Sequence, residues 1–189
     1  MAKIEVNDVS KVFGDKPERG LDLLAEGYSK DEILDKTGLT VGVSKANFEV
    51  ESQEIFVIMG LSGSGKSTLL RCLNRLIEPT GGEVIMDGTN LMDLDQEELR
   101  KFRREKFGMV FQHFALFPHR TVLENTEFGL EIQGVPEEER KAKAEEALAK
   151  VGLDGWENKK PDQLSGGMQQ RVGLARALAV DPDILLMDE

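Results

Sequence analysis

The chain has 189 residues, enough for one domain with a sizeable core. Its composition is 40% hydrophobic and 31% charged, which excludes an intrinsically disordered chain, and no apolar run approaches membrane-spanning length. A formal net charge of −11 argues against a nucleic-acid partner, which usually needs a basic surface. The N-terminus lacks the apolar segment of a secretory signal, and Cys72 is the single cysteine, so we expect a cytoplasmic protein without disulfides.

The first forty residues predict a strand followed by a helical insertion. Apolar and polar residues alternate over 3–13, as in a half-buried strand. Over 15–40 the apolar residues take helical spacing, Ser29 and Glu32 fit a capping box, and Gly38 ends the segment. We therefore expect a small helical insertion between two strands, the second of them over 41–50.

The most informative stretch follows, from Gly60 to Thr68, and reads Gly-Leu-Ser-Gly-Ser-Gly-Lys-Ser-Thr. It fits the phosphate-loop pattern G-x-x-x-x-G-K-[ST]. The apolar run 55–59 before it predicts a buried strand, and apolar residues from Leu69 to Ile77 after it recur at helical spacing. In that setting, backbone N–H groups and the positive end of a helix would surround a polyphosphate.

Further elements follow in an alternating pattern. The sequence predicts a strand over 83–86, a short helix capped by Asp95, and a strand over 107–111. Residues 112–160 are expected to be mostly helical, with a capping box at Thr121 and a charged, solvated helix that begins at Pro136. The closing strand over 184–187 is apolar at every position, which suits a parallel strand covered on both faces.

Three further motifs join the phosphate loop. They are Gln112 after the strand that ends at Phe111, the run 164–171 (Leu-Ser-Gly-Gly-Met-Gln-Gln-Arg), and the closing strand with Asp188 and Glu189 at its end. Their order and spacing resemble ATP-binding-cassette (ABC) ATPases. The opening 11–14, the insertion with 28–34, and Gly60–Gly63 look like the ATP subunits of glycine betaine/proline (osmoprotectant) importers, because ordinary cassettes lack that insertion.

The resemblance implies an α/β fold: a P-loop NTPase (RecA-like) core with a mostly parallel sheet, an N-terminal antiparallel β subdomain and an inserted helical subdomain. We expect the nucleotide-binding core over 1–111 and 169–189, incomplete at its C-terminal end and carrying the insertion at 15–40. The helical subdomain would cover 112–168 and carry Gln112 and the signature motif.

The resemblance also implies site roles. Phe13 would stack on adenine, although a core aromatic at a strand end is the alternative. Glu189 would polarise the attacking water, and Gln112 would contact that water or the metal. The remaining nucleotide-binding residues would be Gly60, Ser62, Gly63, Ser64, Gly65, Lys66, Ser67 and Thr68. Mg²⁺ would be held by Ser67, Gln112 and Asp188. The signature residues Ser165, Gly166, Gly167 and Gln169 would cap the ATP bound to a second copy in a head-to-tail dimer.

The implied function is an ATP- and Mg²⁺-dependent ATPase subunit that powers import of a compatible solute at the cytoplasmic face of the cell membrane. Its partners would be a second copy, an integral membrane permease and, indirectly, a substrate-binding protein, with no nucleic acid. The apolar segment 114–118 either meets the permease or belongs to the core of the helical subdomain. Three alternatives remain: the ATPase of another importer, for example for amino acids; a soluble cassette protein acting on nucleic acid or cofactor assembly; and a non-enzymatic nucleotide-binding fragment.

The resemblance would continue beyond Glu189 with a dimer-contact loop, further strands, a strand-end histidine and, often, regulatory domains. We therefore expect a fragment or truncated copy that binds nucleotide weakly and hydrolyses it poorly by itself.

Overall fold

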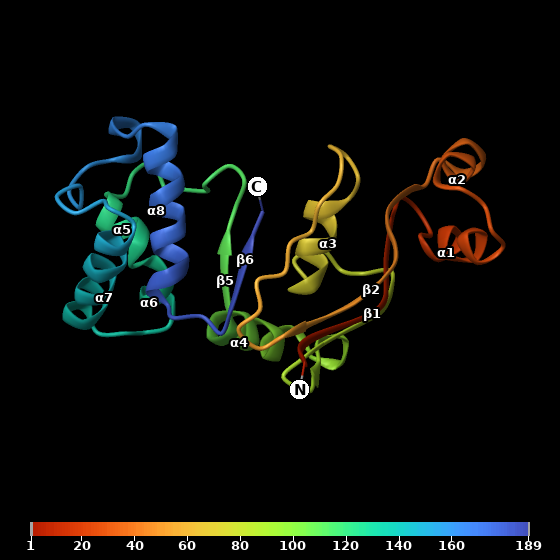
Figure 1. Ribbon diagram of the computed structural model, residues 1–189, viewed down its shortest axis with the longest axis horizontal. Helices are drawn as coiled ribbons and strands as arrows, with labels where there is room; N and C mark the ends of the chain where they lie inside the picture. The colour runs from red at the N-terminus through yellow and green to blue at the C-terminus, as the bar shows by residue number, and fades with distance from the viewer. Residues whose placement is uncertain (1, 189) are drawn as a thin grey trace. The chain divides into compact units, whose positions relative to one another are not determined.

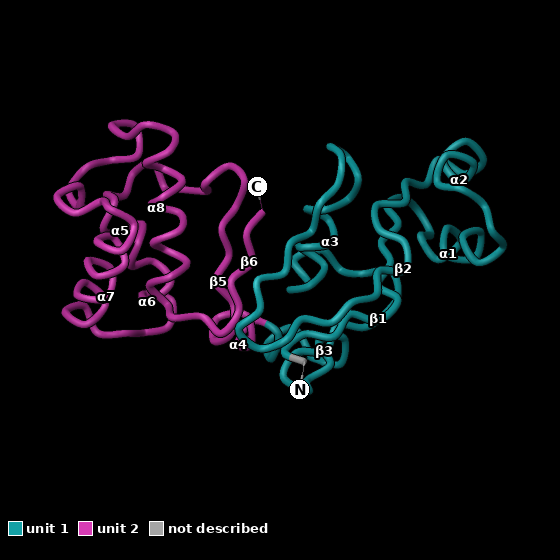
Figure 2. The backbone as a smooth tube through the Cα atoms, viewed as in Figure 1, with its two compact units in different colours: residues 1–99 teal, residues 100–189 magenta. Residues whose placement is uncertain are grey.

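The computed structural model describes residues 2–188, and the chain forms two compact units, residues 1–99 and 100–189 (Figure 2). Figure 1 shows the elements of both units in ribbon form. In chain order they are β1 (Ala2–Phe13), α1 (Glu18–Ala25), α2 (Lys30–Thr37), β2 (Thr40–Glu51), α3 (Lys66–Leu73), β3 (Gly81–Met86), β4 (Thr89–Asn90), the 3₁₀ turn η1 (Leu91–Asp93), α4 (Gln96–Lys106), β5 (Phe107–Val110), α5 (Val122–Thr126), α6 (Phe128–Ile132), α7 (Glu137–Lys150), the 3₁₀ turn η2 (Pro161–Gln163), α8 (Gly166–Ala179) and β6 (Ile184–Met187).

The first unit is built on an antiparallel sheet with the strand order β2-β1-β3-β4. β1 pairs with β2 along its length, from Ala2 opposite Glu51 to Phe13 opposite Thr40, and its other edge pairs with β3. Val6, Val9 and Val12 on β1 are buried together with apolar residues of the neighbouring strands. The predicted strands over 3–13, 41–50 and 83–86 are therefore confirmed, because alternating apolar residues had one face to cover.

The helical insertion between β1 and β2 is also confirmed. Its second helix, α2, begins at the capping box: the Ser29 N–H donates to the Glu32 carboxylate at 2.8 Å, and the Glu32 N–H donates to Ser29 Oγ at 3.3 Å. Gly38 ends the helix in the left-handed conformation, with φ of 72°. Ile33 and Leu39 pack with Val12 in one apolar cluster, so the insertion is fixed to the end of the sheet.

The predicted strand over 55–59 is wrong. The segment carries no regular secondary structure, and the exposed fractions of Ile55 and Met59 are 90% and 85%. Apolar residues on both faces suit a strand with covered faces inside a sheet, and no strand of the first unit's four-stranded sheet pairs with this segment. The following helix also ends sooner than expected, at Leu73, because Arg75 takes a positive φ of 53°.

The second unit combines a parallel strand pair with a helical cluster. β5 and β6 run parallel in register, from Phe107 opposite Ile184 to Val110 opposite Met187. Helices α5, α6, α7 and α8 pack around one apolar core, to which Leu130, Leu148 and Leu153 contribute buried side chains. The α/β fold class is confirmed, with an antiparallel N-terminal sheet, a parallel pair and a helical part.

Local signals in the second unit also hold. The Glu124 N–H donates to Thr121 Oγ1, and the Thr121 N–H donates to the Glu124 carboxylate, which completes the predicted capping box before α5. On α7, which was predicted as a charged, solvated helix, Glu146 and Lys150 form an ion pair at 2.7 Å with both side chains exposed. The domain division at residues 111 and 168 stays a prediction. Within residues 2–188, no helix combines the length and the apolar character needed to cross a bilayer.

Candidate functional site

The glycine-rich loop lies immediately before α3. Gly65 is the residue before the helix and has φ of 96°, and Gly63 has φ of 76°, both in the left-handed region that favours glycine. The Ser64 N–H donates to the Leu61 carbonyl at 3.2 Å, and the Leu69 N–H donates to the Gly65 carbonyl at 2.8 Å. The N-terminus of α3, which carries unpaired backbone amides and the positive end of the helix dipole, therefore adjoins the loop.

The loop packs tightly against β2 at a single point. A Cβ atom on Gly65 would lie 2.1 Å from the carbonyl oxygen of Gly42, a separation that real Cβ atoms do not show. By contrast, a Cβ on Gly63 would meet nothing within 4 Å. Glycine at position 65 is thus required both by the backbone conformation and by the close approach of β2, whereas position 63 requires only the conformation.

Lys66 folds over this loop. Its ammonium group donates to the carbonyl oxygens of Gly60 at 2.9 Å and Leu61 at 2.8 Å. Two carbonyl dipoles of the loop therefore hold the cation beside the loop backbone. A polyphosphate bound there would offer stronger, charge-assisted acceptors to the same ammonium. Ser67 and Thr68 follow in the first turn of α3 and are half-buried.

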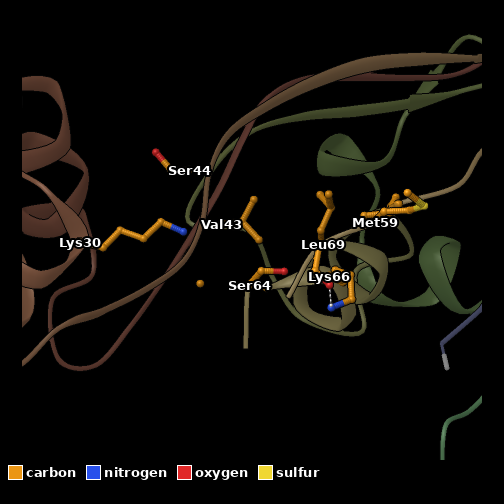
Figure 3. A pocket seen from close by; sticks show the side chains of 11 residues that line it. Lys30, Val43, Ser44, Met59, Ser64, Lys66 and Leu69 are labelled. Atoms are coloured by element: carbon orange, nitrogen blue, oxygen red, sulfur yellow. Dashed lines mark hydrogen bonds between the residues drawn. The ribbon is translucent and has the colours of Figure 1, made fainter. Parts of the chain in front are cut away.

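A pocket with a volume of about 300 Å³ lies beside the loop (Figure 3). Its walls come from the start of β2, the segment before the loop, the loop itself and the first residue of α2. The lining residues are Lys30, Gly42, Val43, Ser44, Ile58, Met59, Gly60, Ser64, Gly65, Lys66 and Leu69. The volume is at the lower limit of the range usual for small-molecule sites.

Phe13 lies next to this pocket, at the end of β1. Its ring carbon Cε2 would be 2.8 Å from a Cβ on Gly42, so the ring packs over the glycine that lines the pocket. The Lys11 ammonium is 5.1 Å from the ring centroid, and 39% of the residue remains exposed. The ring is therefore accessible for stacking, in contrast to the fully buried valines of the same strand.

The second unit brings Gln112 and Asp188 to the same end of the parallel pair. Gln112 is exposed in the turn after β5, and Asp188, which follows β6, is 3% exposed. The Asp188 N–H donates to the Val110 carbonyl at 2.9 Å, which extends the pairing by one residue. Ligands bind at the carboxyl ends of parallel strands in open α/β sheets, so this placement suits a site. Glu189, expected to be catalytic, lies outside the described residues.

The signature motif begins α8. Ser165 caps the helix and accepts from the Met168 N–H at 3.4 Å, whereas Gly166 and Gly167 are exposed, and a Cβ at either glycine would meet nothing within 4 Å. The Gln169 amide nitrogen donates to the carbonyls of Pro161 at 2.9 Å and Leu164 at 3.3 Å, and its expected contact with the ATP of a second copy stays a prediction. The first turn of α8 is therefore an open surface of backbone amides, and Gln169 secures the preceding loop.

Sequence reasoning missed two residues of these surfaces. Lys30 lines the pocket from the insertion, and Arg176 on α8 donates to the carbonyls of Phe114 and Ala115, just after Gln112. For Lys30 the sequence shows only that a lysine follows the Ser29 helix cap. No sequence pattern indicates that this cap lies near the glycine loop. Arg176 had none, because both its acceptors are backbone atoms about sixty residues away.

The fold and the glycine loop together define a phosphate-loop α/β protein. The chain belongs to the ABC transporter family, whose profile matches residues 43–189. It is 64% identical over 99% of its length to the glycine betaine transport ATP-binding protein OpuAA of Bacillus subtilis. It is also 57% identical over 99% of its length to the glycine betaine/proline betaine transport system ATP-binding protein ProV of Escherichia coli.

A solved structure adds to this relationship. The dimeric, ADP- and Pi-bound post-hydrolysis state of the ATP-binding cassette MJ0796 superposes with a TM-score of 0.81 at 38% identity. That match covers 98% of this chain and 73% of the MJ0796 chain. The chain spans 45% of OpuAA and 47% of ProV, so it corresponds to about half the length of these curated relatives.

Proposed function

We propose that the chain is the nucleotide-binding part of an ATPase subunit that powers import of a compatible solute. The observation that carries the proposal is the glycine loop: it leads directly into the N-terminus of α3, and the Lys66 ammonium lies against its backbone, in a sequence pattern that binds nucleoside triphosphates. The 64% identity over nearly the whole chain to a glycine betaine transport ATP-binding protein supports the solute class.

The share of the chain that each group of relatives matches favours a betaine-like solute over an amino acid. Relatives whose names state glycine betaine, carnitine or trimethylamine N-oxide transport match 98% to 100% of the chain. Those named for methionine import match 86% and 79% of it. The named solutes in the first group share a methylated nitrogen centre, so we assign a small solute of that chemistry.

In the first unit, the loop residues Gly60, Ser62, Gly63, Ser64 and Gly65 would offer their amides to the phosphates of ATP. Lys66 would exchange its two carbonyl acceptors for phosphate oxygens, and Phe13 would stack on the adenine ring. Ser67 and Thr68 would add hydroxyl groups in the first turn of α3.

In the second unit, Gln112 and Asp188 would act at the carboxyl ends of β5 and β6. Together with the Ser67 hydroxyl they would supply only oxygen donors, which fits Mg²⁺, an ion that binds through few protein oxygens together with phosphate and water. Residues 2–188 contain no cluster of three His, Cys, Asp or Glu suited to a metal, and this kind of shared site needs none. Mg²⁺ would offset negative charge on the phosphates, and Glu189 would polarise the attacking water.

The exposed first turn of α8 argues for contact with a second copy of the chain. Ser165, Gly166 and Gly167 would present amides to the ATP of a second copy, in a head-to-tail dimer that completes both sites. Dimer closure would be transmitted to an integral membrane permease, which receives its solute from a binding protein. The assembly would lie at the cytoplasmic face of the membrane.

The test reconstitutes the protein, as its gene encodes it, with its permease in lipid vesicles and measures phosphate release from ATP. We expect glycine betaine to stimulate release more than methionine does, and Lys66→Ala to abolish it. Lys101→Ala, which removes an exposed lysine outside the loop, is the matched control and should retain activity. Hydrolysis that is indifferent to every solute, or that survives Lys66→Ala, would disprove the proposal.

A further inference from the structure

The charge of the pocket lining is opposite in sign to the net charge of the whole chain. The formal net charge of the sequence is −11, yet the pocket lining contains two lysines, Lys30 and Lys66, and no carboxylate. The other lining residues are glycine, serine or apolar. A small pocket with two positive charges and low-polarity walls attracts an anion, because the apolar walls screen the charges less than water does.

The two lysines come from different parts of the fold. Lys66 belongs to the glycine loop, whereas Lys30 is the first residue of α2 in the insertion between β1 and β2. Figure 3 shows the Lys30 side chain extending toward Val43 from the insertion, while Ser64 and Lys66 lie on the opposite, loop side of the view. The insertion thus contributes a cation to a pocket otherwise built from β2 and the loop region.

Local structure fixes the origin of the Lys30 side chain. The Ser29 and Glu32 capping box sets the first turn of α2, and the fully buried Ile33 anchors the same turn to the cluster that contains Val12 and Leu39. A lysine on a mobile loop would lose more conformational entropy on binding than one that begins an anchored helix. Only the side chain of Lys30 needs to be ordered.

No group in the described part of the chain neutralises this cation. Lys30 makes no ion pair or hydrogen bond with another side chain of residues 2–188, whereas the neighbouring Glu32 accepts from both the N–H and the hydroxyl of Ser29. An exposed lysine on a helix is usually only solvated. At the edge of a positive pocket, however, an uncompensated ammonium is available to an anionic ligand.

We propose that Lys30 is a nucleotide-binding residue, supplied by the helical insertion, whose ammonium contacts the phosphate chain on the side away from Lys66. The inference rests on the proposed nucleotide site and extends it, because it makes the insertion part of that site. Nucleotide affinity then depends on the position of α1 and α2, and a displacement of the insertion lowers it.

The experiment uses the protein as its gene encodes it and measures the Kd of ADP and of a non-hydrolysable ATP analogue by calorimetry. We expect Lys30→Gln to weaken both by about 5- to 20-fold, as for the loss of one charge-assisted contact, and Lys30→Glu to weaken them further. Lys30→Arg keeps the charge and should restore most of the affinity. The dependence of log Kd on log salt concentration should become shallower in Lys30→Gln.

Lys16→Gln is the matched control, since it removes one exposed lysine from the same insertion at a position outside the pocket lining. It should bind nucleotide as the wild type does. Circular dichroism and the thermal midpoint of each variant establish that the insertion is folded. Equal Kd values for wild type and Lys30→Gln would overturn the role of Lys30 and leave the loop site standing. A wild type that binds neither nucleotide would overturn the site itself, and this inference with it.

Discussion

Arg176 donates from Nη2 to the backbone carbonyl oxygen of Phe114 at 2.8 Å, and from Nη1 to that of Ala115 at 2.6 Å. Both acceptor residues have positive φ, 54° and 48°, in a conformation that costs non-glycine residues about 1 to 2 kcal/mol each. Burial lowers the pKa of Arg176, but the guanidinium remains charged at neutral pH. One side chain of α8 therefore holds the turn that follows Gln112 in a strained backbone conformation.

We expect Arg176→Ala to destabilise the second unit by about 2 kcal/mol, because two carbonyl groups lose a charged donor. Hydrogen exchange should rise selectively over residues 112–117. Arg171→Ala is the matched control: it removes a guanidinium on the same helix that donates to the carbonyls of Val151 and Gly152. Its exchange increase should fall near residue 151, and an increase at 112–117 in both variants would contradict the specific contact.

The two left-handed glycines of the loop provide a second test. Gly63→Ala should cost about 1 kcal/mol, because only the positive φ is strained and the site is open. Gly65→Ala should cost about 3 kcal/mol, because its Cβ also collides with the Gly42 carbonyl. Urea denaturation followed by fluorescence and circular dichroism measures both. Equal losses for the two variants would mean that β2 does not approach the loop as described.

Substitution of a signature glycine tests dimer assembly separately from folding. A Cβ at Gly167 meets nothing within 4 Å in the chain, and alanine is the better helix former, so Gly167→Ala should fold at least as stably as the wild type. If a second copy places its ATP there, the added methyl group blocks that approach. We expect ATP-dependent dimerisation, measured by analytical ultracentrifugation of the protein as its gene encodes it, to weaken more than about tenfold.

The control for this variant is Glu138→Ala, an exposed position on α7. It should dimerise as the wild type does. Unchanged dimerisation of Gly167→Ala would remove the start of α8 from the interface, whereas a lower thermal midpoint would show that the glycine has a structural role within the chain.

Features that depend on neighbouring residues were predictable from the sequence. The capping boxes at Ser29 and Thr121 form as expected, because all their hydrogen-bonding groups lie within four residues. The strand over 3–13 also forms, since its alternating apolar residues need only one covered face.

Features that depend on distant partners were not predictable. The run 55–59 has the composition of a buried strand, but composition does not supply the strands that must pair with it. Arg75 ends α3 early, and its guanidinium donates to the carbonyls of Leu91 and Leu94. The pocket position of Lys30 likewise depends on how the insertion packs. The roles assigned to Phe13 and the loop residues stay predictions, although the chain places them side by side.

Cys72 gives a direct measure of whether the helix after the loop is folded. The residue is fully buried on α3, and burial raises the pKa of its thiol to about 11. At pH 8 the thiolate, which is the reactive form, is therefore scarce and shielded in the folded chain. In the unfolded chain the thiol has a pKa of about 8.5, so a larger fraction is thiolate at the same pH. We expect Cys72 to react with a disulfide reagent far more slowly in buffer than in urea. Fast labelling of the folded protein at pH 8 would mean that α3 opens readily.

The raised pKa of the Cys72 thiol also predicts a contribution to the free energy of unfolding that is fully present below about pH 8.5. This contribution is lost as the pH rises toward 11, because in that range the thiol ionises only in the unfolded chain.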